Sequence, residues 1–345
     1  MSANDILLEV KDLKVYFPVY AGIFQRKVAD VKAVDGVSFT IKRGETLGLV
    51  GESGCGKTTV GRAVINVLRH VSPDVHISGE VNYYDETGKA TNLLHLKTKD
   101  MRAYRSKIQM IFQDPFSSLN ARLSVKQIVA EPMEIHHPEM SQKEIDERVN
   151  WLLEKVGLQP AHAARFPHEF SGGQRQRVGI ARALATNPDL IICDEPVSAL
   201  DVSVQAQVIN LMEDLRDEFK MSYLFIAHDL SVVYHISQRI AVMYLGSMAE
   251  IGSSDQVYFN ATHPYSKALL SALPIPDPHR TDKHRIVLEG DIPTPLNKPS
   301  GCGFRTRCPI AKPECANAVP LLDAKSDGRF VACPYVQVDV SANVA

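Results

Sequence analysis

Residues 51–58 have the spacing of a phosphate-binding loop. They read Gly-Glu-Ser-Gly-Cys-Gly-Lys-Thr, which fills every constrained position of the pattern G-x-x-x-x-G-K-[ST]. An apolar run precedes the loop and a helix-compatible run follows it, which is the strand–loop–helix context that the pattern requires. We expect Lys57 to reach the β- and γ-phosphates of a nucleotide and the Thr58 hydroxyl to ligate Mg²⁺. The predicted nucleotide-binding residues here are Gly51, Glu52, Ser53, Gly54, Cys55, Gly56, Lys57, Thr58 and Thr59.

Two carboxylates follow an apolar run that is typical of a buried parallel strand. Residues 190–193 are Leu-Ile-Ile-Cys, and Asp194 and Glu195 come directly after them. Because the carboxyl ends of such strands face the ligand crevice of open α/β sheets, we expect Asp194 to hold Mg²⁺ and Glu195 to polarise an attacking water. The alternative is an acidic pair that only faces solvent. His228 follows the apolar run 221–227 in the same way, although a lone histidine is more often structural.

A second predicted helix start could bind an anion. Ser171 stands in the N-cap position before a strong helical pattern, and Gly172, Gly173 and Gln174 follow it. An ordinary capped helix is the alternative. Aromatic rings before the 51–58 loop could stack on a base, and Phe17 is the candidate, with Tyr16 in reserve. Packing within a small sheet would explain these two rings equally well.

The composition restricts the class of protein. A chain of 345 residues with 45% hydrophobic content can form one large domain, or one domain with an appendage. The net charge of −2 provides no general basic surface for nucleic acid. No apolar run approaches the ~18 residues of a membrane span, and the first residues do not read as a secretory signal. We therefore expect a soluble, intracellular protein unless a partner holds it at a membrane.

The hydrophobic pattern predicts the elements around these motifs. Short strands are expected at 6–10, 13–17 and 34–41, with a loop or insertion over residues 18–32. Residues 123–158 are predicted to be mainly helical, and 239–252 a hairpin.

Four of the six cysteines gather near the end of the chain. In a reducing compartment such a cluster suggests a metal rather than disulfides, and four thiolates suit zinc or an iron–sulfur cluster. The spacing lacks the C-x₂-C pairs of zinc ribbons, and two Cys-Pro steps are similar to those of ferredoxin-type loops. Spacing alone leaves zinc and the cluster open. The predicted ligands are Cys302, Cys308, Cys315 and Cys333.

Together these motifs resemble the nucleotide-binding subunit of ABC transporters over residues 1 to about 255. The resemblance implies an α/β fold of the P-loop NTPase class: a RecA-like mixed sheet, a small antiparallel β subdomain and a helical subdomain at about 114–180. It assigns Gln113, at the end of an apolar run, to the Mg²⁺ site and to the link with the helical subdomain. The loop that contains Asp201 matches the family's D-loop, and His228 matches its γ-phosphate sensor. Phe170 stands where leucine is more general.

The resemblance also implies that two such subunits pair head to tail. The γ-phosphate held by Lys57 would be capped by the other subunit's counterparts of Ser171 and Gly173, and the reverse would hold for the other ATP. Closing both faces of the nucleotide excludes water and strengthens each charge interaction.

Residues 256–345 resemble the C-terminal extension of oligopeptide/dipeptide-type ABC ATPases. The matching residues include His263-Pro264-Tyr265 and Arg307-Cys308-Pro309. In that family the four cysteine positions carry a [4Fe–4S] cluster. Arg305 stands where a histidine is more usual, and Asn120-Ala121-Arg122 stands where Asn-Pro-Arg is common.

The resemblance implies an ATPase at the cytoplasmic face of a prokaryotic membrane. Its expected partners are a second, non-identical ATPase subunit, two transmembrane permease subunits and an extracytoplasmic solute-binding protein. Oligosaccharides or metal chelates are alternative solutes to peptides. Two other classes compete: a soluble ABC ATPase of translation or DNA repair, and a redox sensor on an ATPase scaffold. The single phosphate-binding loop and the lack of a coiled-coil insertion speak against the first of these.

Overall fold

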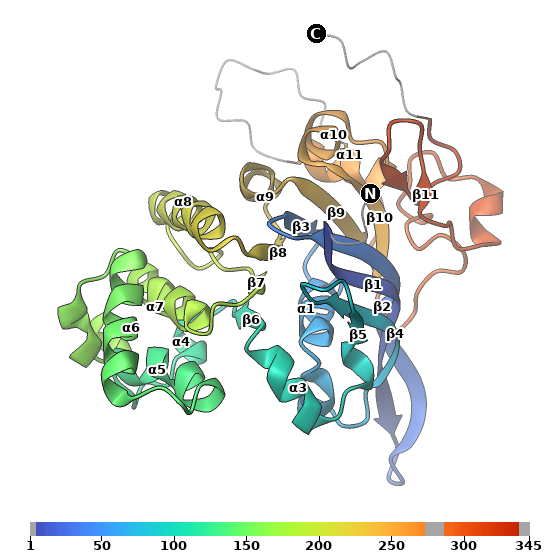
Figure 1. Cartoon of the computed structure of the whole chain (residues 1–345). Helices are drawn as coiled ribbons and strands as arrows, with labels where there is room; N and C mark the ends of the chain where they lie inside the picture. Colours follow the sequence, from blue (N-terminus) through green and yellow to red (C-terminus); the bar gives the residue numbers. More distant parts are fainter. Residues whose placement is uncertain (1–4, 273–285, 338–345) are drawn as a thin grey trace. The chain divides into compact units, whose positions relative to one another are not determined.

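The computed structural model describes residues 5–272 and 286–337 (Figure 1). The chain divides into two compact units, and each is described by itself. The first unit consists of residues 1–8, 41–46 and 83–227, and the second of 9–40, 47–82 and 228–345.

Three parallel strands form the core of the first unit. They are β6 (Ile108–Ile111), β7 (Leu190–Asp194) and β8 (Ser222–Ala227), in the order β8-β7-β6. Every residue of β7 and β8 is buried. Their unbroken apolar runs are what a parallel sheet covered on both faces requires, so the predicted strands at 190–193 and 221–227 are confirmed.

Helices make up most of the rest of the first unit. Residues 123–158 are mainly helical, as the pattern predicts. Three helices, α5, α6 and α7, pack against one another, and each begins with a capping box in which a serine and a Gln or Glu satisfy each other's backbone N–H. The elements are β5 (Ala90–Asn92), α3 (Thr98–Arg105), α4 (Pro115–Ser118), α5 (Val125–His136), α6 (Gln142–Lys155), α7 (Gly172–Leu184) and α8 (Val202–Phe219).

The second unit contains a mixed sheet. Its strands run in the order β11-β12-β10-β9-β3, with β3 parallel to β9 and the remaining pairs antiparallel. The predicted hairpin at 239–252 is present as β9 and β10. The strands are β3 (Thr46–Val50), β9 (Arg239–Tyr244), β10 (Ser247–Ser253), β11 (Asp323–Ala324) and β12 (Phe330–Val331).

A long hairpin corrects one prediction. β1 (Ile6–Ala21) and β2 (Arg26–Lys42) run on through residues 18–32, where a loop or insertion is expected from the sequence, and Gly22 and Gln25 close the turn. Ile23 and Phe24 at the tip are almost fully exposed. Neither face of this stretch is buried, so no polarity pattern marks it as strand. β1 also neighbours β4 (His76–Tyr84).

The helices of the second unit are short. They are α1 (Lys57–Val64), α2 (Leu68–Val71), α9 (Leu230–Ile236), α10 (Ser254–Asn260) and α11 (Pro264–Ser271). Residues 286–337 contain little regular structure beyond β11, β12 and a 3₁₀ turn at Pro313–Ala316.

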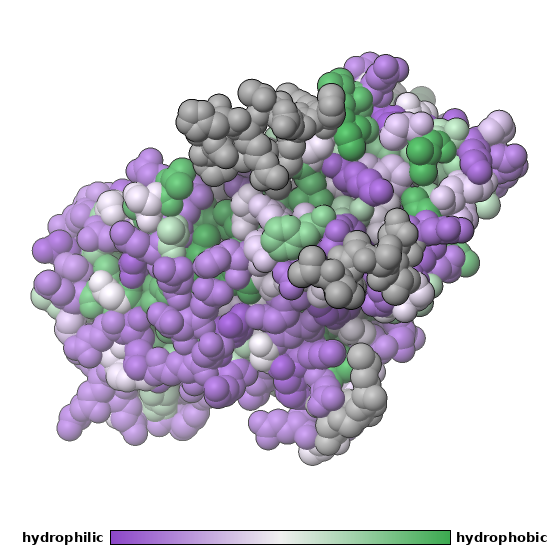
Figure 2. Space-filling model, turned by 90° about the horizontal axis from the view of Figure 1, so that it is seen from above, coloured by the Kyte–Doolittle hydropathy of each residue, from purple (hydrophilic) through white to green (hydrophobic). Residues whose placement is uncertain are grey.

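No helix in the two described stretches of the chain is both long enough and apolar enough to cross a membrane. The face shown in Figure 2 is mostly hydrophilic, with hydrophobic residues in separate patches.

A buried ion pair fastens the C-terminal residues to β10. Glu250 is fully buried, and its carboxylate accepts hydrogen bonds from the backbone N–H groups of Thr262 and His263 and from the guanidinium of Arg329, at 3.3 Å. Arg329 also donates to Asp327 and to the carbonyl of Asn260. Arg329 directly precedes β12, so the Arg329–Glu250 ion pair and the β10–β12 ladder both attach this segment to β10.

Arg329→Gln is expected to lower the free energy of unfolding by about 3–5 kcal/mol, because it leaves the Glu250 carboxylate buried without its cation. Chemical denaturation of the full chain measures this. Lys143→Gln is the control: Lys143 is exposed beside Glu147, so its loss should change the stability by less than about 0.5 kcal/mol. Equal effects of the two variants would contradict the prediction.

Candidate nucleotide-binding site and cysteine cavity

The 51–58 loop connects β3 to α1 and leaves no room for side chains at two of its glycines. Gly56 has φ +105°, and a Cβ there would lie 2.1 Å from the carbonyl oxygen of Ala33. A Cβ at Gly51 would lie 2.1 Å from the carbonyl oxygen of Met243. The backbone of the loop is therefore packed directly against the backbone of β2 and β9, and only glycine fits at either position.

Lys57 lies inside this loop. Its side chain is buried, and Nζ donates to the carbonyls of Gly51, at 2.8 Å, and Glu52, at 3.0 Å. Lys57 is also the first residue of α1, so the ammonium and the helix start occupy the same loop. Thr58 and Thr59 follow in the first helical turn. Burial raises the pKa of the Cys55 thiol, which keeps that side chain neutral.

The candidate base-stacking rings lie on β1. The Tyr16 hydroxyl donates to Asp35 at 2.6 Å. Burial raises the pKa of Tyr16 most, and the hydrogen bond to Asp35 raises it further. Phe17 is half-buried. The predicted role of Phe17, or of Tyr16 in its place, stays a prediction.

In the first unit, the structure brings Gln113 and Glu195 together. The Gln113 amide donates to Glu195 Oε2 at 2.9 Å, and the Glu195 N–H donates to the carbonyl of Ile226. Glu195 has φ +47°, a left-handed conformation that non-glycine residues rarely adopt and that clusters at functional sites. Asp194, the last residue of β7, is buried. The end of β7 thus carries two carboxylates, one of them held from both its side chain and its backbone.

Ser171 is the N-cap of α7, as its position in the sequence predicts. Its hydroxyl accepts from the N–H of Gln174, whose side-chain oxygen in turn accepts from the N–H of Ser171. The hydroxyl proton of the exposed Ser171 can still be donated outward. A Cβ at Gly173 would lie 2.5 Å from Cγ1 of Val204, so a side chain there would require the Val204 side chain to move.

The predicted site residues are divided between the two units. Gln113, Ser171, Gly172, Gly173, Gln174, Asp194, Glu195 and Asp201 belong to the first unit; Tyr16, Phe17, residues 51–59 and the exposed His228 belong to the second. Asp201 directly precedes α8. Asp229, which follows His228 in the sequence, caps α9.

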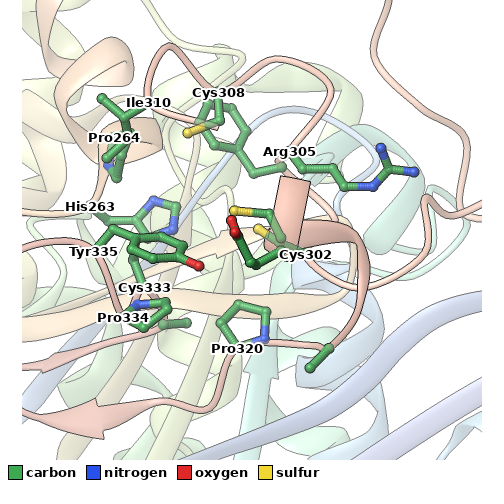
Figure 3. Close-up of a pocket in the computed structure, with 15 residues that line it drawn as sticks. His263, Pro264, Cys302, Arg305, Cys308, Ile310, Pro320, Cys333, Pro334 and Tyr335 are labelled. Carbon is green, nitrogen blue, oxygen red and sulfur yellow. The ribbon is translucent and has the colours of Figure 1, made fainter. Parts of the chain in front are cut away.

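All four C-terminal cysteines line one cavity of about 210 Å³ in the second unit, here called the cysteine cavity. Figure 3 shows His263, Pro264 and Tyr335 around it, with Cys308 lying apart from Cys302. Backbone contacts shape the walls: the N–H of Cys302 donates to the carbonyl of Cys315 at 2.8 Å. The N–H of Lys312 points at the Cys315 sulfur at 3.5 Å. Burial raises the pKa of Cys302 and of Cys308.

Among residues 5–272 and 286–337, no group of three or more His, Cys, Asp or Glu side chains is close enough to hold a metal ion. The expected Cys-rich metal module is therefore present only as four thiols around a shared cavity, without an assembled ligand set.

Sequence reasoning missed the contacts that reach Glu52 from the C-terminal region. Arg307 Nη1 donates to Glu52 Oε2 at 3.0 Å, and the Tyr265 hydroxyl accepts from the Glu52 N–H at 2.9 Å. These partners are more than two hundred positions away from Glu52, so no local pattern could have revealed them.

Comparisons with known proteins agree with the geometry. The family model described as ABC transporter matches residues 34–198, and that described as oligopeptide/dipeptide transporter, C-terminal region, matches residues 249–315. The parallel strands, the 51–58 loop and these matches define an ATPase of the ABC transporter class. Two solved structures support the fold: the cassette MJ0796 bound to ADP and Pi (TM-score 0.60, 27% identity, covering 72% of this chain and 99% of that one) and cbiO1 from Clostridium perfringens (TM-score 0.59, 25% identity, 74% and 92%).

Curated relatives narrow the class. The oligopeptide transport ATP-binding protein AppF of Bacillus subtilis (strain 168) is 53% identical over 331 residues, 96% of this chain and 97% of AppF. OppF of Escherichia coli (strain K12) is 54% identical over 321 residues, 92% of this chain and 93% of OppF. The chain belongs to the ATP-binding subunits of oligopeptide/dipeptide ABC importers, and its ATPase activity is coupled to transport.

Gly56→Ala is expected to lower affinity for ATP by tenfold or more, because the new methyl group cannot coexist with the Ala33 carbonyl and the loop must move. Equilibrium binding of a fluorescent ATP analogue to the full chain measures this. Gly54→Ala is the matched control, since it has a similar positive φ of +77° but open space around its Cβ. Equal losses in both variants would show that backbone strain, rather than the contact with Ala33, controls the loop.

Proposed function

We propose that this chain is one of two non-identical ATPase subunits that drive peptide import from the cytoplasmic face of a prokaryotic membrane. The other partners are two transmembrane permease subunits and an extracytoplasmic solute-binding protein. The similar proteins are oligopeptide and dipeptide transport ATP-binding proteins, which supports peptides over oligosaccharides or metal chelates as the solute. The observation that carries the ATPase assignment is the 51–58 loop, where Lys57 lies inside a backbone that admits only glycine at two positions.

ATP would be held mainly by backbone N–H groups of this loop. The start of α1 adds its positive end, and Lys57 would exchange its two carbonyl partners for phosphate oxygens. Mg²⁺, which fits a donor set of hydroxyl, carboxylate and amide oxygens, would be held by Thr58, Asp194 and Gln113. When bound, Mg²⁺ neutralises charge on the phosphates.

Glu195 is the proposed base that polarises the attacking water. Its hydrogen bond from Gln113 and its backbone bond to Ile226 support this role, because they restrict the orientation of the carboxylate. His228 would sense the γ-phosphate, and Phe17 or Tyr16 would stack on the base.

The start of α7 is proposed to face the other subunit's ATP. Ser171 and the N–H groups of Gly172, Gly173 and Gln174 lie at an accessible helix start, which favours an anion. Asp201 would contribute at the same interface. The similar cassette MJ0796 has a structure described as dimeric, which supports this pairing.

The cysteine cavity is proposed to hold a [4Fe–4S] cluster bound by Cys302, Cys308, Cys315 and Cys333. The donor set fits: four thiols line a single cavity. Zinc is the alternative group for the same four thiols. The thiols would have to converge on the group. When bound, the cluster would cross-link segments that have little regular structure of their own.

Glu195→Gln is expected to lower ATP hydrolysis by the assembled transporter by about 10²–10⁴-fold while keeping ATP bound, because the amide cannot accept a proton from water. Turnover and retained nucleotide are measured on the same sample. Lys57→Ala separates the steps, since it should lose ATP binding itself. Normal turnover of Glu195→Gln would remove Glu195 as the base, and unchanged ATP affinity of Lys57→Ala would contradict the role of the loop.

Cys302→Ser is expected to lower the iron content of anaerobically purified protein, together with its visible absorbance, because a thiolate ligand is lost. Elemental analysis distinguishes iron from zinc. Cys193→Ser is the control, since Cys193 is buried in β7 and does not line the cysteine cavity. Equal iron content in Cys302→Ser and the unaltered chain would show that Cys302 is no ligand.

A further inference from the structure

Every polar group of Glu52 is held by a partner. Arg307 Nη1 donates to both carboxylate oxygens, at 3.0 and 3.2 Å, and Nη2 donates to Oε1 at 3.2 Å. The Glu52 N–H donates to the Tyr265 hydroxyl at 2.9 Å, and the Glu52 carbonyl accepts from Lys57 at 3.0 Å. The Cys55 N–H also donates to the Glu52 carbonyl, at 3.3 Å, so both Cys55 and Lys57 are local partners. Tyr265 comes from α11, and Arg307 comes from residues 302–333, here called the cysteine-rich region.

The contact between Arg307 and Glu52 is shielded from solvent. The side chains are 8% and 23% exposed, so their attraction is screened less than that of a surface pair. Arg307 has one other side-chain acceptor, the Tyr244 hydroxyl at 3.4 Å, and its buried Nε–H has no partner within the described residues. Among residues 5–272 and 286–337, Glu52 is thus the only carboxylate paired with Arg307.

We infer that Arg307 is a positioning residue for ATP binding: it neutralises the Glu52 carboxylate and holds the start of the 51–58 loop. The inference rests on the proposed role of this loop. A triphosphate carries several negative charges, and an unpaired carboxylate in the second residue of its binding loop would repel it. Arg307 cancels that repulsion without touching the nucleotide.

The same contacts place the cysteine-rich region beside the loop. Arg307 immediately precedes Cys308, which lines the cysteine cavity, and the buried Phe304 lines the same cavity. The Phe304 ring packs against Tyr244 at 5.2 Å and Tyr265 at 5.5 Å between centroids. The wall of the cavity is therefore continuous with the groups that hold Glu52. This gives residues 302–308 a role in nucleotide binding that is separate from the metal binding proposed for Cys302 and Cys308.

The test is a double-mutant cycle on ATP binding by the full chain. Arg307→Gln should weaken binding of a fluorescent ATP analogue by about tenfold, which corresponds to about 1.4 kcal/mol. In the Glu52→Gln background the same substitution should cost less than about threefold, because no carboxylate is left to repel the phosphates. The loss should also shrink at high salt, which a purely structural role would not produce.

Two variants control the cycle. Lys267→Gln removes a positive charge from an exposed position of α11, two residues from Tyr265, and should leave the affinity unchanged. Arg307→Lys keeps the charge and should recover most of the affinity, and it serves as the test variant if Arg307→Gln does not fold.

Equal losses in both backgrounds, or no loss from Arg307→Gln, would overturn the inference. If Arg307→Lys stands in for a glutamine variant that does not fold, a salt-independent loss equal in both backgrounds would do the same. Failure of the unaltered chain to bind ATP would instead overturn the proposed function, so the two outcomes are distinguishable.

Discussion

The 51–58 loop is shaped by steric exclusion. The carbonyls of Ala33 and Met243 lie so close to Gly56 and Gly51 that no other residue fits. Those carbonyls belong to β2 and β9, so the hairpin and the mixed sheet of the second unit define the curvature of the loop. Gly246 makes a third contact with the loop, because its N–H donates to the carbonyl of Cys55. The Gly246 carbonyl in turn accepts from the N–H of Asp35.

Within the second unit, charged contacts fasten the C-terminal region to the other segments. Glu52 and Glu250 are both shielded carboxylates, and each is paired with an arginine from residues 286–337. Lys298 makes a similar contact with Asp35 at 3.0 Å. Since this region has little regular structure, ion pairs, the Phe304 ring and the short β10–β12 ladder provide the contacts that an apolar core would otherwise make. The division at residue 255 that the sequence suggests stays a prediction.

The groups proposed for chemistry are divided between two units. The loop that would hold ATP lies in one, and the proposed base and the Gln113 amide in the other. Within the first unit the Gln113–Glu195 hydrogen bond already holds the base in one orientation. If a second subunit closes around ATP as proposed, hydrolysis would depend on that closure, as it does in enzymes whose loops or domains close over the substrate.

The sequence by itself determined the features that depend on near neighbours. The residue pattern of the 51–58 loop, the capped start of α7 at Ser171 and the buried strand that ends at Asp194 can each be recognised from residues within one turn or one strand. Only the tertiary structure decided the rest. The hairpin over 18–32 has no buried face, so backbone pairing alone reveals it. The four cysteines share a cavity through folding, yet their thiols do not form a ligand set in the described residues. Arg307 contacts Glu52 although the two are more than two hundred positions apart. The sequence could not reveal this pair, because a charge pair requires only proximity in space and leaves no periodic pattern in the chain.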